Sequence, residues 1–403
     1  MIKDLSLITI PRDDYKDYRY EVIFRAYKWD PQVADVNTVA DHILLISAKT
    51  ANMLEGLAEL LSAETVKIEE ALLKNPKAAC ELGISHKVLR RLKMIKNYHR
   101  EEHVRLMRFD FHPTEDGWVV SEVNSDVPAG IAEASILPEL ANPFCKSAAP
   151  RGNIANSILK AYSPLIQHCP RVAFVHATAY GEDRQVLQCL GDVFEGHGIE
   201  VVYAAPNQLK WAADKAFSIV NNQNKEIGGV VRYFPAEWLA GYGFSYNWAG
   251  YFTTRLPSCN HPIALYSQSK RVPLIWESLG FDCPAWKSKL PLTTEPRFTG
   301  LNESDWIYKP AMSRVGEGIT IKEAISEKEY KKIIKDVKKY PKKWVSQRRF
   351  KSLPLLNDRD EEYHLCVGVF TLNGKSAGFY GRASTYPKID DKAIDIPILV
   401  SKE

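Results

Sequence analysis

Apolar residues recur at helical spacing through the first quarter of the chain. Met53, Leu57, Leu60 and Leu61 fall on one side of a helix, and similar spacing continues, with basic residues in between, to about residue 105. A period near 3.6 residues is the pattern of an amphipathic helix. We therefore predict a helical opening over residues 38–105.

The period then changes to two, which predicts a β-hairpin. The segments RLMRFDFHP, TEDG and WVVSEVNSD read as two alternating strands around a turn. A three-residue loop at Glu115–Gly117, with its glycine in the left-handed conformation, would set the register. Asp110 would then lie opposite Glu122, and Arg108 opposite Asn124. A bulge beside the loop would shift this register by one residue.

The middle of the chain predicts a parallel sheet. Residues 171–206 read as an apolar strand, a helix and a second apolar strand, and residues 228–243 offer another strand. Two strands joined by a helix run parallel in one sheet.

The C-terminal part mixes helices and strands. Ser326 and Glu329 form a capping box at the start of a helix that should end near Lys339, and its buried stripe should consist of Tyr330, Ile333, Ile334 and Val337. The other expected elements are a helix over 270–279, a glycine-containing hairpin over 306–321, and strands over 344–350, 364–372 and 376–382.

Composition narrows the class of protein. Fifty-three Lys and Arg against 49 Asp and Glu leave a net charge of +4 over 403 residues, too balanced for a dedicated nucleic-acid or membrane-surface binder. No stretch approaches the roughly 18 apolar residues of a spanning helix, and the opening residues are too charged for a signal peptide. The seven cysteines lack metal or redox spacing, so we expect free thiols. We expect a cytoplasmic globular protein that binds neither nucleic acid nor membranes.

The predicted hairpin would bring two carboxylates together. Asp110 and Glu122, about 5 Å apart at Cβ, would repel each other unless a positive charge lay between them. With Asn124 they offer hard oxygen ligands that suit Mg²⁺, which takes further ligands from water and nucleotide phosphates. The alternative is an exposed acid pair satisfied by Arg108 or a lysine.

Two lysines further along are candidates for binding phosphate. Lys309 ends a predicted strand before a loop with Gly316 and Gly318, whose backbone N–H groups can approach a phosphate closely. Lys270 lies near the start of a predicted helix, where a cation costs about 0.3 to 1 kcal/mol and a bound phosphate would offset that cost. The alternative for each is a solvent-facing lysine.

Further polar residues could contact ligands. Gln347 can donate and accept at once, which suits an adenine edge, or it is an ordinary strand side chain. Arg382 offers five donors for a carboxylate or phosphoryl group. Glu182, Asp183 and Arg184 follow a predicted parallel strand at the edge where ligands of α/β sheets bind, or they begin the next helix.

Together, five segments resemble the ATP-grasp synthetase domain of the glutathionylspermidine synthase family. They are RFDFHPTEDGWVVSEVNSDVPAG, SQSKRVPLIWESLG, WIYKPAMSRVGEGITI, WVSQRRFKSLP and GFYGRAS, and the resemblance runs from about Arg108 to the C-terminus. In ordinary ATP-grasp enzymes the acid-x-Asn metal motif follows the lysines. In this family it precedes them, as the hairpin precedes Lys270 and Lys309 here.

The resemblance implies roles for the hairpin residues. Asp110, Glu122 and Asn124 match the Mg²⁺ ligands, and Arg108 matches an arginine beside the reacting phosphoryl group.

It also implies roles for downstream residues. Lys270 and Lys309 match the lysines that hold ATP phosphates, and Gly316 falls in the mobile loop that covers them. Gln347 falls in the adenine hinge, and Arg382 matches a second arginine that steadies developing negative charge.

The implied fold is α/β (α+β): an ATP-grasp fold with a helical N-terminal segment and an inserted parallel-sheet domain of pre-ATP-grasp type. The expected division is 1–103 for the helical segment, 104–150 for the metal-binding hairpin part of the ATP-grasp domain, 151–262 for the pre-ATP-grasp-like substrate domain, and 263–403 for the lysine, lid and hinge portion.

The implied activity is an ADP-forming carbon–nitrogen ligase that uses ATP and Mg²⁺ to join a carboxylate to an amine through an acyl phosphate. Small-molecule or peptide acids and amines would be its partners, with Glu182, Asp183 and Arg184 as candidate substrate contacts. After Asn124 the chain reads SDVPAGIAEAS, without the hydroxyl-containing continuation typical near the family's acid substrate, so that acid need not be glutathione. The residues specify neither the amine nor the oligomeric state.

Two other functions stay open. The chain could bind nucleotide as a sensor or scaffold without ligase activity, although binding alone needs fewer groups than are present. It could instead bind nucleic acid through the basic run over 331–351, whose lysines otherwise form the solvated face of a helix. A steep salt dependence of binding would identify that last function.

Overall fold

The structure is a computed structural model that describes residues 4–29, 31–33, 35–96, 98–212, 215–241, 248–299, 305–313, 319–321 and 325–402. None of the helices in these ranges has the length and apolar character needed to cross a membrane. All seven cysteines are free thiols, as expected.

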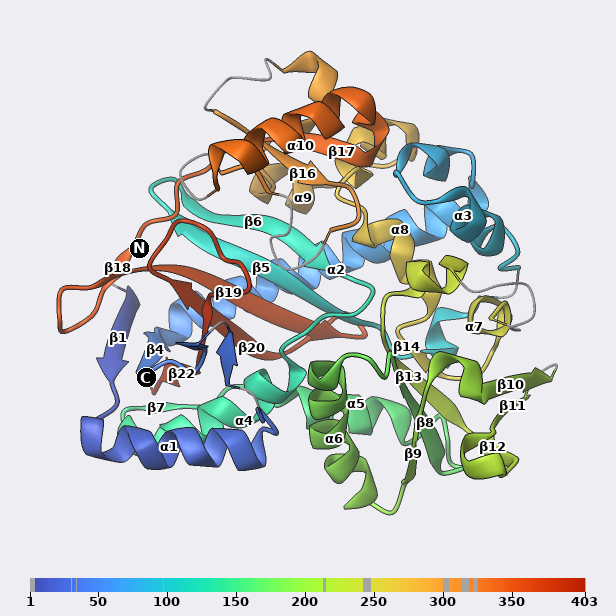
Figure 1. Cartoon of the computed structure of the whole chain (residues 1–403), viewed down its shortest axis with the longest axis horizontal. Coiled ribbons are helices and arrows are strands. Elements are labelled where there is room, and N and C mark those ends of the chain that lie inside the picture. Colours follow the sequence, from blue (N-terminus) through green and yellow to red (C-terminus); the bar gives the residue numbers. More distant parts are fainter. Residues whose placement is uncertain are drawn as a thin grey trace.

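A six-stranded antiparallel sheet lies at the centre of the molecule (Figure 1). Its order is β21, β20, β19, β5, β6, with β18 paired to β19. The strands are β5 (Leu106–Thr114), β6 (Gly117–Asn124), β18 (Leu355–Leu356), β19 (Glu362–Leu372), β20 (Lys375–Ser384) and β21 (Ile394–Ile396). The early hairpin and the C-terminal strands therefore form one sheet.

The two faces of this sheet differ in chemistry. Alternation along β5 places Met107, Phe109 and Phe111 on one face, where they are buried in a core shared with α2 (Ala48–Lys74). The charged residues between them point from the opposite face. The apolar face anchors the sheet, and the polar face lines a cavity.

A parallel sheet occupies the middle of the chain, as predicted. Its order is β14, β13, β8, β9, and all neighbouring strands run parallel. A small antiparallel sheet lies beside it (Figure 1). The elements of this region are α5 (Ile154–Tyr162), β8 (Arg171–His176), α6 (Gly181–Glu195), β9 (Glu200–Ala204), β10 (Leu209–Ala212), β11 (Lys215–Ser218), β12 (Lys225–Ile227), β13 (Gly229–Tyr233), α7 (Gly250–Thr253) and β14 (Ser258–Cys259).

The N-terminal segment, expected to be helical, is helical only in part. Helix α2 confirms the predicted helix, but β1 (Leu5–Thr9) and β4 (His42–Ile46) belong to a sheet with order β1, β4, β22, β7. Strand β4 pairs in parallel with β22 (Ile398–Ser401), a partner too distant in sequence for periodicity to reveal. The other elements nearby are α1 (Arg12–Arg25), β2 (Gln32–Val33), β3 (Val36–Asn37), α3 (His86–Leu92), α4 (Ile131–Ala141) and β7 (Ala148–Ala149).

The strand that carries Lys309 has an unexpected partner. Strand β16 (Trp306–Pro310) pairs with β17 (Trp344–Arg348) and not with residues 319–321, which we expected to complete its hairpin. Thr320 still contacts β16, because its backbone N–H donates to Tyr308 O at 3.2 Å.

Helix α10 (Glu327–Lys339) covers this small sheet (Figure 1). Ser326 Oγ accepts from the backbone N–H of Glu329 at 3.2 Å, as the capping sequence predicts. Ile333 and Val337 are buried, as expected. The remaining elements are α8 (Leu265–Gln268), α9 (Pro284–Lys289) and β15 (Thr293–Thr294).

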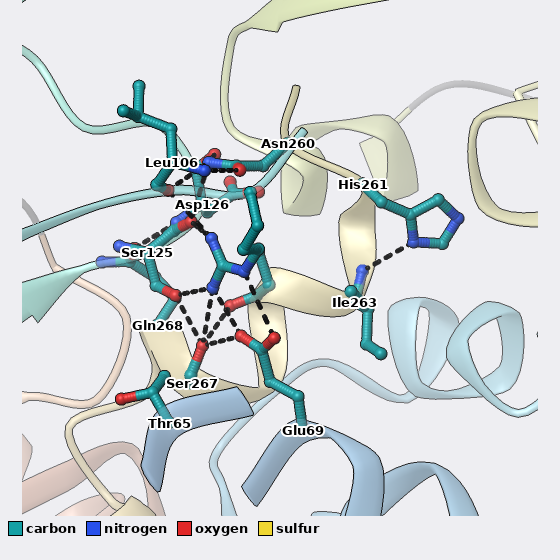
Figure 2. A network of polar contacts seen from close by, with 12 residues as sticks. Thr65, Glu69, Leu106, Ser125, Asp126, Asn260, His261, Ile263, Ser267 and Gln268 are labelled. Carbon is teal, nitrogen blue, oxygen red and sulfur yellow. Dashed lines mark hydrogen bonds and ion pairs between the residues drawn. The ribbon is translucent and has the colours of Figure 1, made fainter. Parts of the chain in front are cut away.

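Two buried ion pairs join these parts at the end of β6. Arg105, just before β5, binds Glu69 of α2 and donates to Ser125 O at 2.7 Å. Ser267 of α8 donates to the same carboxylate. Figure 2 shows Glu69, Ser125 and Ser267 around this contact.

The second pair fixes the next residue along the chain. Asp126 binds Arg232 of β13, and both side chains are buried. Gln268 Oε1 accepts the backbone N–H groups of Ser125 and Asp126, each at 2.8 Å (Figure 2). The turn after β6 is therefore bonded to α8, just before Lys270.

Breaking the first pair should destabilise the whole protein. The variant Arg105→Met leaves the Glu69 carboxylate buried without its cation, a change that typically costs about 3 to 5 kcal/mol. We expect the free energy of unfolding in urea to fall by this amount. Lys375→Met, which removes an exposed ion pair with Glu59, is the matched control and should cost less than about 1 kcal/mol. Equal losses in the two variants would contradict the role of the junction.

Candidate functional site

A cavity of about 670 Å³ opens over the polar face of the central sheet. A smaller cavity of about 50 Å³ shares Glu122 and Lys309 with it and adds Lys270 and Gln347. The sequence-predicted residues that line the larger cavity are Arg108, Asp110, Glu122, Asn124, Glu182, Asp183, Lys309 and Arg382. Most of the candidate residues therefore meet in one region.

The hairpin has the predicted pairs but a different loop. Asp110 lies opposite Glu122, and Arg108 lies opposite Asn124. The loop has two residues, not the three expected, because Gly117, with φ 116°, already pairs as the first residue of β6.

A β-bulge at Ser121 compensates for the shorter loop. Phe111 pairs with Val120 and Asp110 pairs with Glu122, so Ser121 is the extra residue. Without the bulge Asp110 would oppose Ser121, and Glu122 would point to the other face of the sheet. The bulge therefore keeps both carboxylates on the cavity side.

Asp110 is neutralised by an arginine of its own strand. The Arg108 guanidinium donates to the carboxylate at 2.7 and 2.9 Å, and Asn124 Nδ2 donates to it at 3.0 Å. Asp110 is 6% exposed. The alternative prediction, an exposed acid pair neutralised by Arg108 or a lysine, is thus correct in that Arg108 binds Asp110. It is wrong about exposure, because Asp110 is buried beside the cavity.

Glu122 is neutralised by downstream lysines. Lys270 Nζ lies 3.0 Å from its carboxylate. Burial alone would raise the pKa of Glu122, but the charges of Lys270 and Lys309 lower the pKa to about 2. The carboxylate is therefore ionised at neutral pH, and residues far apart in sequence form one charge cluster.

The two lysines are held in place by backbone oxygens. Lys270 Nζ donates to Ser313 O at 2.8 Å, and Lys309 Nζ donates to Ser121 O at 3.4 Å. Lys309 is 3% exposed, and burial lowers its pKa to about 8. The helix predicted over 270–279 is present as a 3-10 helix, η9 (Val272–Ser278), but Lys270 precedes it and lies between α8 and η9. Neither lysine faces solvent.

Gln347 lies with both lysines in the smaller cavity. Its Nε2 donates to Thr293 Oγ1 at 3.0 Å, while its buried Oε1 accepts no hydrogen bond from the described part of the chain. An unpaired buried acceptor is costly, and an amino group on a ligand would satisfy it. Gly316 lies outside the described residues.

Arg382 and Tyr380 extend from β20 into the larger cavity. Arg382 donates to backbone oxygens of the segment after β20. The Tyr380 ring centre lies 5.0 Å from the Arg108 guanidinium, and its hydroxyl donates to Asp395 at 2.6 Å. Gly368 of β19 leaves room for Arg108, since a Cβ there would lie 2.8 Å from Arg108 Cδ.

Residues 182–184 occupy the first turn of α6. Glu182 and Asp183 also line the cavity, so the two interpretations, a ligand contact and the start of a helix, both apply to them. Arg184 instead stacks on Tyr203, with its guanidinium carbon 3.5 Å from the ring centre. Two of the three candidates therefore face the cavity.

Sequence reasoning missed several residues that line the cavity. His112 continues the alternation of Arg108 and Asp110, so the period of two could have found it. Lys28 and Asp395 form a buried ion pair at 2.6 Å from opposite ends of the chain, and no local pattern signals their meeting.

The cluster at the hairpin fits a divalent cation with a polyanion. Among the described residues no group of three His, Cys, Asp or Glu side chains is arranged to hold a metal ion, so Asn124 would supply the third ligand beside Asp110 and Glu122. In the described part of this cluster three cations, Arg108, Lys270 and Lys309, face those two carboxylates. An anionic ligand would neutralise the surplus positive charge.

These features define a mixed α/β protein with a largely buried acid and lysine cluster between the central antiparallel sheet and strand β16 of a second antiparallel sheet. Residues 11–401 match the family described as glutathionylspermidine synthase preATP-grasp. The chain belongs to this family.

One solved structure shares the fold, and a second is less similar. A glutathione synthetase-like effector from Globodera pallida, in its apo form, matches with a TM-score of 0.62 and 12% identity over 96% of this chain and 98% of that chain. A provisionally named gamma-glutamylcysteine synthetase from Methylobacillus flagellatus matches with a TM-score of 0.43 and 12% identity over 84% of this chain and 85% of that chain. The first likeness concerns the fold alone. No curated protein sequence matches this chain.

The lowered pKa of Lys309 predicts that its charge destabilises the ligand-free protein. The unfolded chain keeps this proton up to about pH 10.5 and the folded chain only to about pH 8. Stability should therefore rise with pH between these values, and the full penalty applies below pH 8.

The variant Lys309→Met should accordingly raise the free energy of unfolding at pH 7, by about 1 to 3 kcal/mol, and by much less at pH 10. Urea unfolding at both pH values measures the difference. Lys375→Met, which removes an exposed ion pair with Glu59, is the control and should change the free energy of unfolding at pH 7 by less than about 1 kcal/mol. Lower stability of Lys309→Met at pH 7 would contradict the assignment.

Proposed function

We propose that the chain is an ATP- and Mg²⁺-dependent carboxylate–amine ligase that forms an amide bond and releases ADP and phosphate. The observation that carries the proposal is the meeting of Asp110 and Glu122 with Lys270 and Lys309 in one buried cluster. Membership of a synthase family supports the same reaction class.

We infer further that the chain has an ATP-grasp fold, with nucleotide bound between the 104–150 and 263–403 portions. The pairing of β5 with β19 supports joining these portions into one domain. Residues 151–262 would form the substrate domain, and residues 1–103 the N-terminal segment. The free thiols suit a reducing, cytoplasmic location.

Mg²⁺, held by Asp110, Glu122 and Asn124, would supply charge that offsets the triphosphate. Lys270 and Lys309 would hold the phosphates, which replace Glu122 as partners of the lysines. Gln347 would accept from the adenine amino group, because its Oε1 is otherwise unpaired among the described residues.

In the first step an oxygen of the substrate carboxylate attacks the γ-phosphorus, the bond to the β-phosphate oxygen breaks, and ADP leaves. The product is an acyl phosphate. Arg108, already aligned by Asp110 and Tyr380, would stabilise charge on the transferred group.

In the second step the amine nitrogen attacks the acyl carbon, the bond to the phosphate oxygen breaks, and the nitrogen loses a proton. Arg108 and Arg382 would stabilise the oxyanion of the tetrahedral adduct. Burial of this cluster limits hydrolysis of the acyl phosphate by water.

Another part of the cavity suits a protonated amine. Lys28 Nζ lies 3.2 Å from Glu133 and 2.6 Å from Asp395, and the charge of Arg382 also acts on Asp395, so these two acids and two cations balance. The acids of α6 add negative charge to this region. Burial raises the pKa of Tyr233, and the charges of Asp183, Glu133 and Glu182 raise it further, although Arg108 opposes them. A negative potential there would attract a cationic amine.

Loss of either hairpin carboxylate should abolish the reaction. Asp110→Ala or Glu122→Ala should lower Mg²⁺-dependent ADP release by about 100-fold or more, because each removes charge that organises the triphosphate. The substrates come from a matrix of small acids and amines screened with the wild type, with product identified by mass spectrometry.

Asp116→Ala, at the exposed tip of the same hairpin, is the matched control and should retain wild-type ADP release. Full activity of Asp110→Ala or Glu122→Ala would refute the ligase. ATP binding without turnover across the whole matrix would favour the nucleotide sensor.

The acids of α6 should affect the amine and not the nucleotide. The double variant Glu182→Gln, Asp183→Asn should raise the KM for the amine about tenfold, because it removes two charges from the cavity wall, and should leave the KM for ATP unchanged. Glu195→Gln, at the other end of α6, serves as the control. A change confined to the KM for ATP would contradict this placement.

A further inference from the structure

We infer that His112 and Ser121 are positioning residues, which fix the β-bulge and thereby set the place of Glu122 and the backbone partner of Lys309. The inference rests on the proposed function, because it concerns the same site.

His112 presents a fixed hydrogen-bond acceptor to the bulge. Its Nδ1 lies 3.1 Å from Leu365 O, which can only accept, so Nδ1 carries the proton. Nε2 then accepts from the Ser121 hydroxyl at 3.0 Å. The ring packs against Phe350, with 5.1 Å between ring centres, which holds it in this orientation.

Ser121 needs this contact because it is the extra residue of the bulge. A bulged residue is left out of the regular ladder, so the ladder alone does not fix it. Its hydroxyl has one proton, which it donates to His112 Nε2 at 3.0 Å; Asp110 O, 3.3 Å away, is a second acceptor that competes for the same proton. The side chain therefore ties the bulge to β5 where the backbone does not.

Two groups of the proposed site depend on this bulge. Glu122, the next residue, points into the cavity because of the bulge, and Ser121 O accepts from Lys309 Nζ at 3.4 Å. The Ser121 hydroxyl thus positions both Glu122, a proposed Mg²⁺ ligand, and the backbone oxygen that binds Lys309, a proposed phosphate-binding residue. His112 is not placed as a base, since the lone pair of its Nε2 is engaged by Ser121.

Calorimetry of Mg²⁺ binding to protein saturated with a non-hydrolysable ATP analogue tests the inference. Ser121→Ala removes the hydroxyl, and His112→Asn keeps an amide near Leu365 O while removing the acceptor for Ser121. Each should raise the Kd for Mg²⁺ about tenfold, as loss of a residue that orients metal ligands typically does. The double variant should match either single variant, because all three lack the same hydrogen bond.

Two controls separate positioning from general damage. Ser121→Thr keeps a hydroxyl and should bind Mg²⁺ like the wild type. Ser163→Ala removes a serine hydroxyl that donates to Leu159 O at 2.8 Å at the end of α5, outside both cavities, and should also leave the Kd unchanged. If His112→Asn does not fold, the comparison of the Kd for Mg²⁺ between Ser121→Ala and Ser121→Thr tests the inference by itself.

An unchanged Kd in Ser121→Ala, or single effects that multiply in the double variant, would overturn the inference. So would a wild type that binds no Mg²⁺, which would refute the ligase as well. A wild type that binds Mg²⁺ without ADP release would refute the ligase alone, and a tenfold weaker Kd in Ser121→Ala would still support the positioning role.

Discussion

Two buried ion pairs hold the turn after β6, and the geometry of the site depends on them. Arg105 binds Glu69, and Asp126 binds Arg232, so helix α2 and strand β13 both reach the end of the hairpin. Breaking one member of such a pair leaves an uncompensated buried charge. Gln268 bonds the same turn from α8, which places Lys270 within reach of Glu122.

The hairpin could be predicted because its signals are local. A period of two over β5 and β6 fixes which side chains share a face, and the pairing of Asp110 with Glu122 follows once the turn is located. The parallel sheet follows from the strand–helix–strand order for the same reason. Placing Lys270 and Lys309 beside the hairpin came from the resemblance to a family, since no spacing links residues so far apart.

The remaining errors have physical causes. The two-residue loop shifts the pairing by one residue, and the bulge at Ser121 shifts it back before Asp110. The same pairing of Asp110 with Glu122 would follow from a three-residue loop, so the sequence pattern does not distinguish the two cases. The helix expected from Lys270 begins two residues later, at Val272, with Pro273 in its first turn, a position where proline is favourable because its missing N–H would be unpaired anyway. The sheet containing β4 and β22, and the buried ion pair of Lys28 with Asp395, join residues from opposite ends of the chain.

The surplus positive charge around the hairpin destabilises the ligand-free protein. The same charge would favour binding of a metal–nucleotide complex. The most direct measurement is a crystal structure with Mg²⁺ and a non-hydrolysable ATP analogue. The account predicts the ion on Asp110 and Glu122, with the phosphates on Lys270 and Lys309. A nucleotide bound elsewhere, with the ion pair between Lys270 and Glu122 intact, would contradict it.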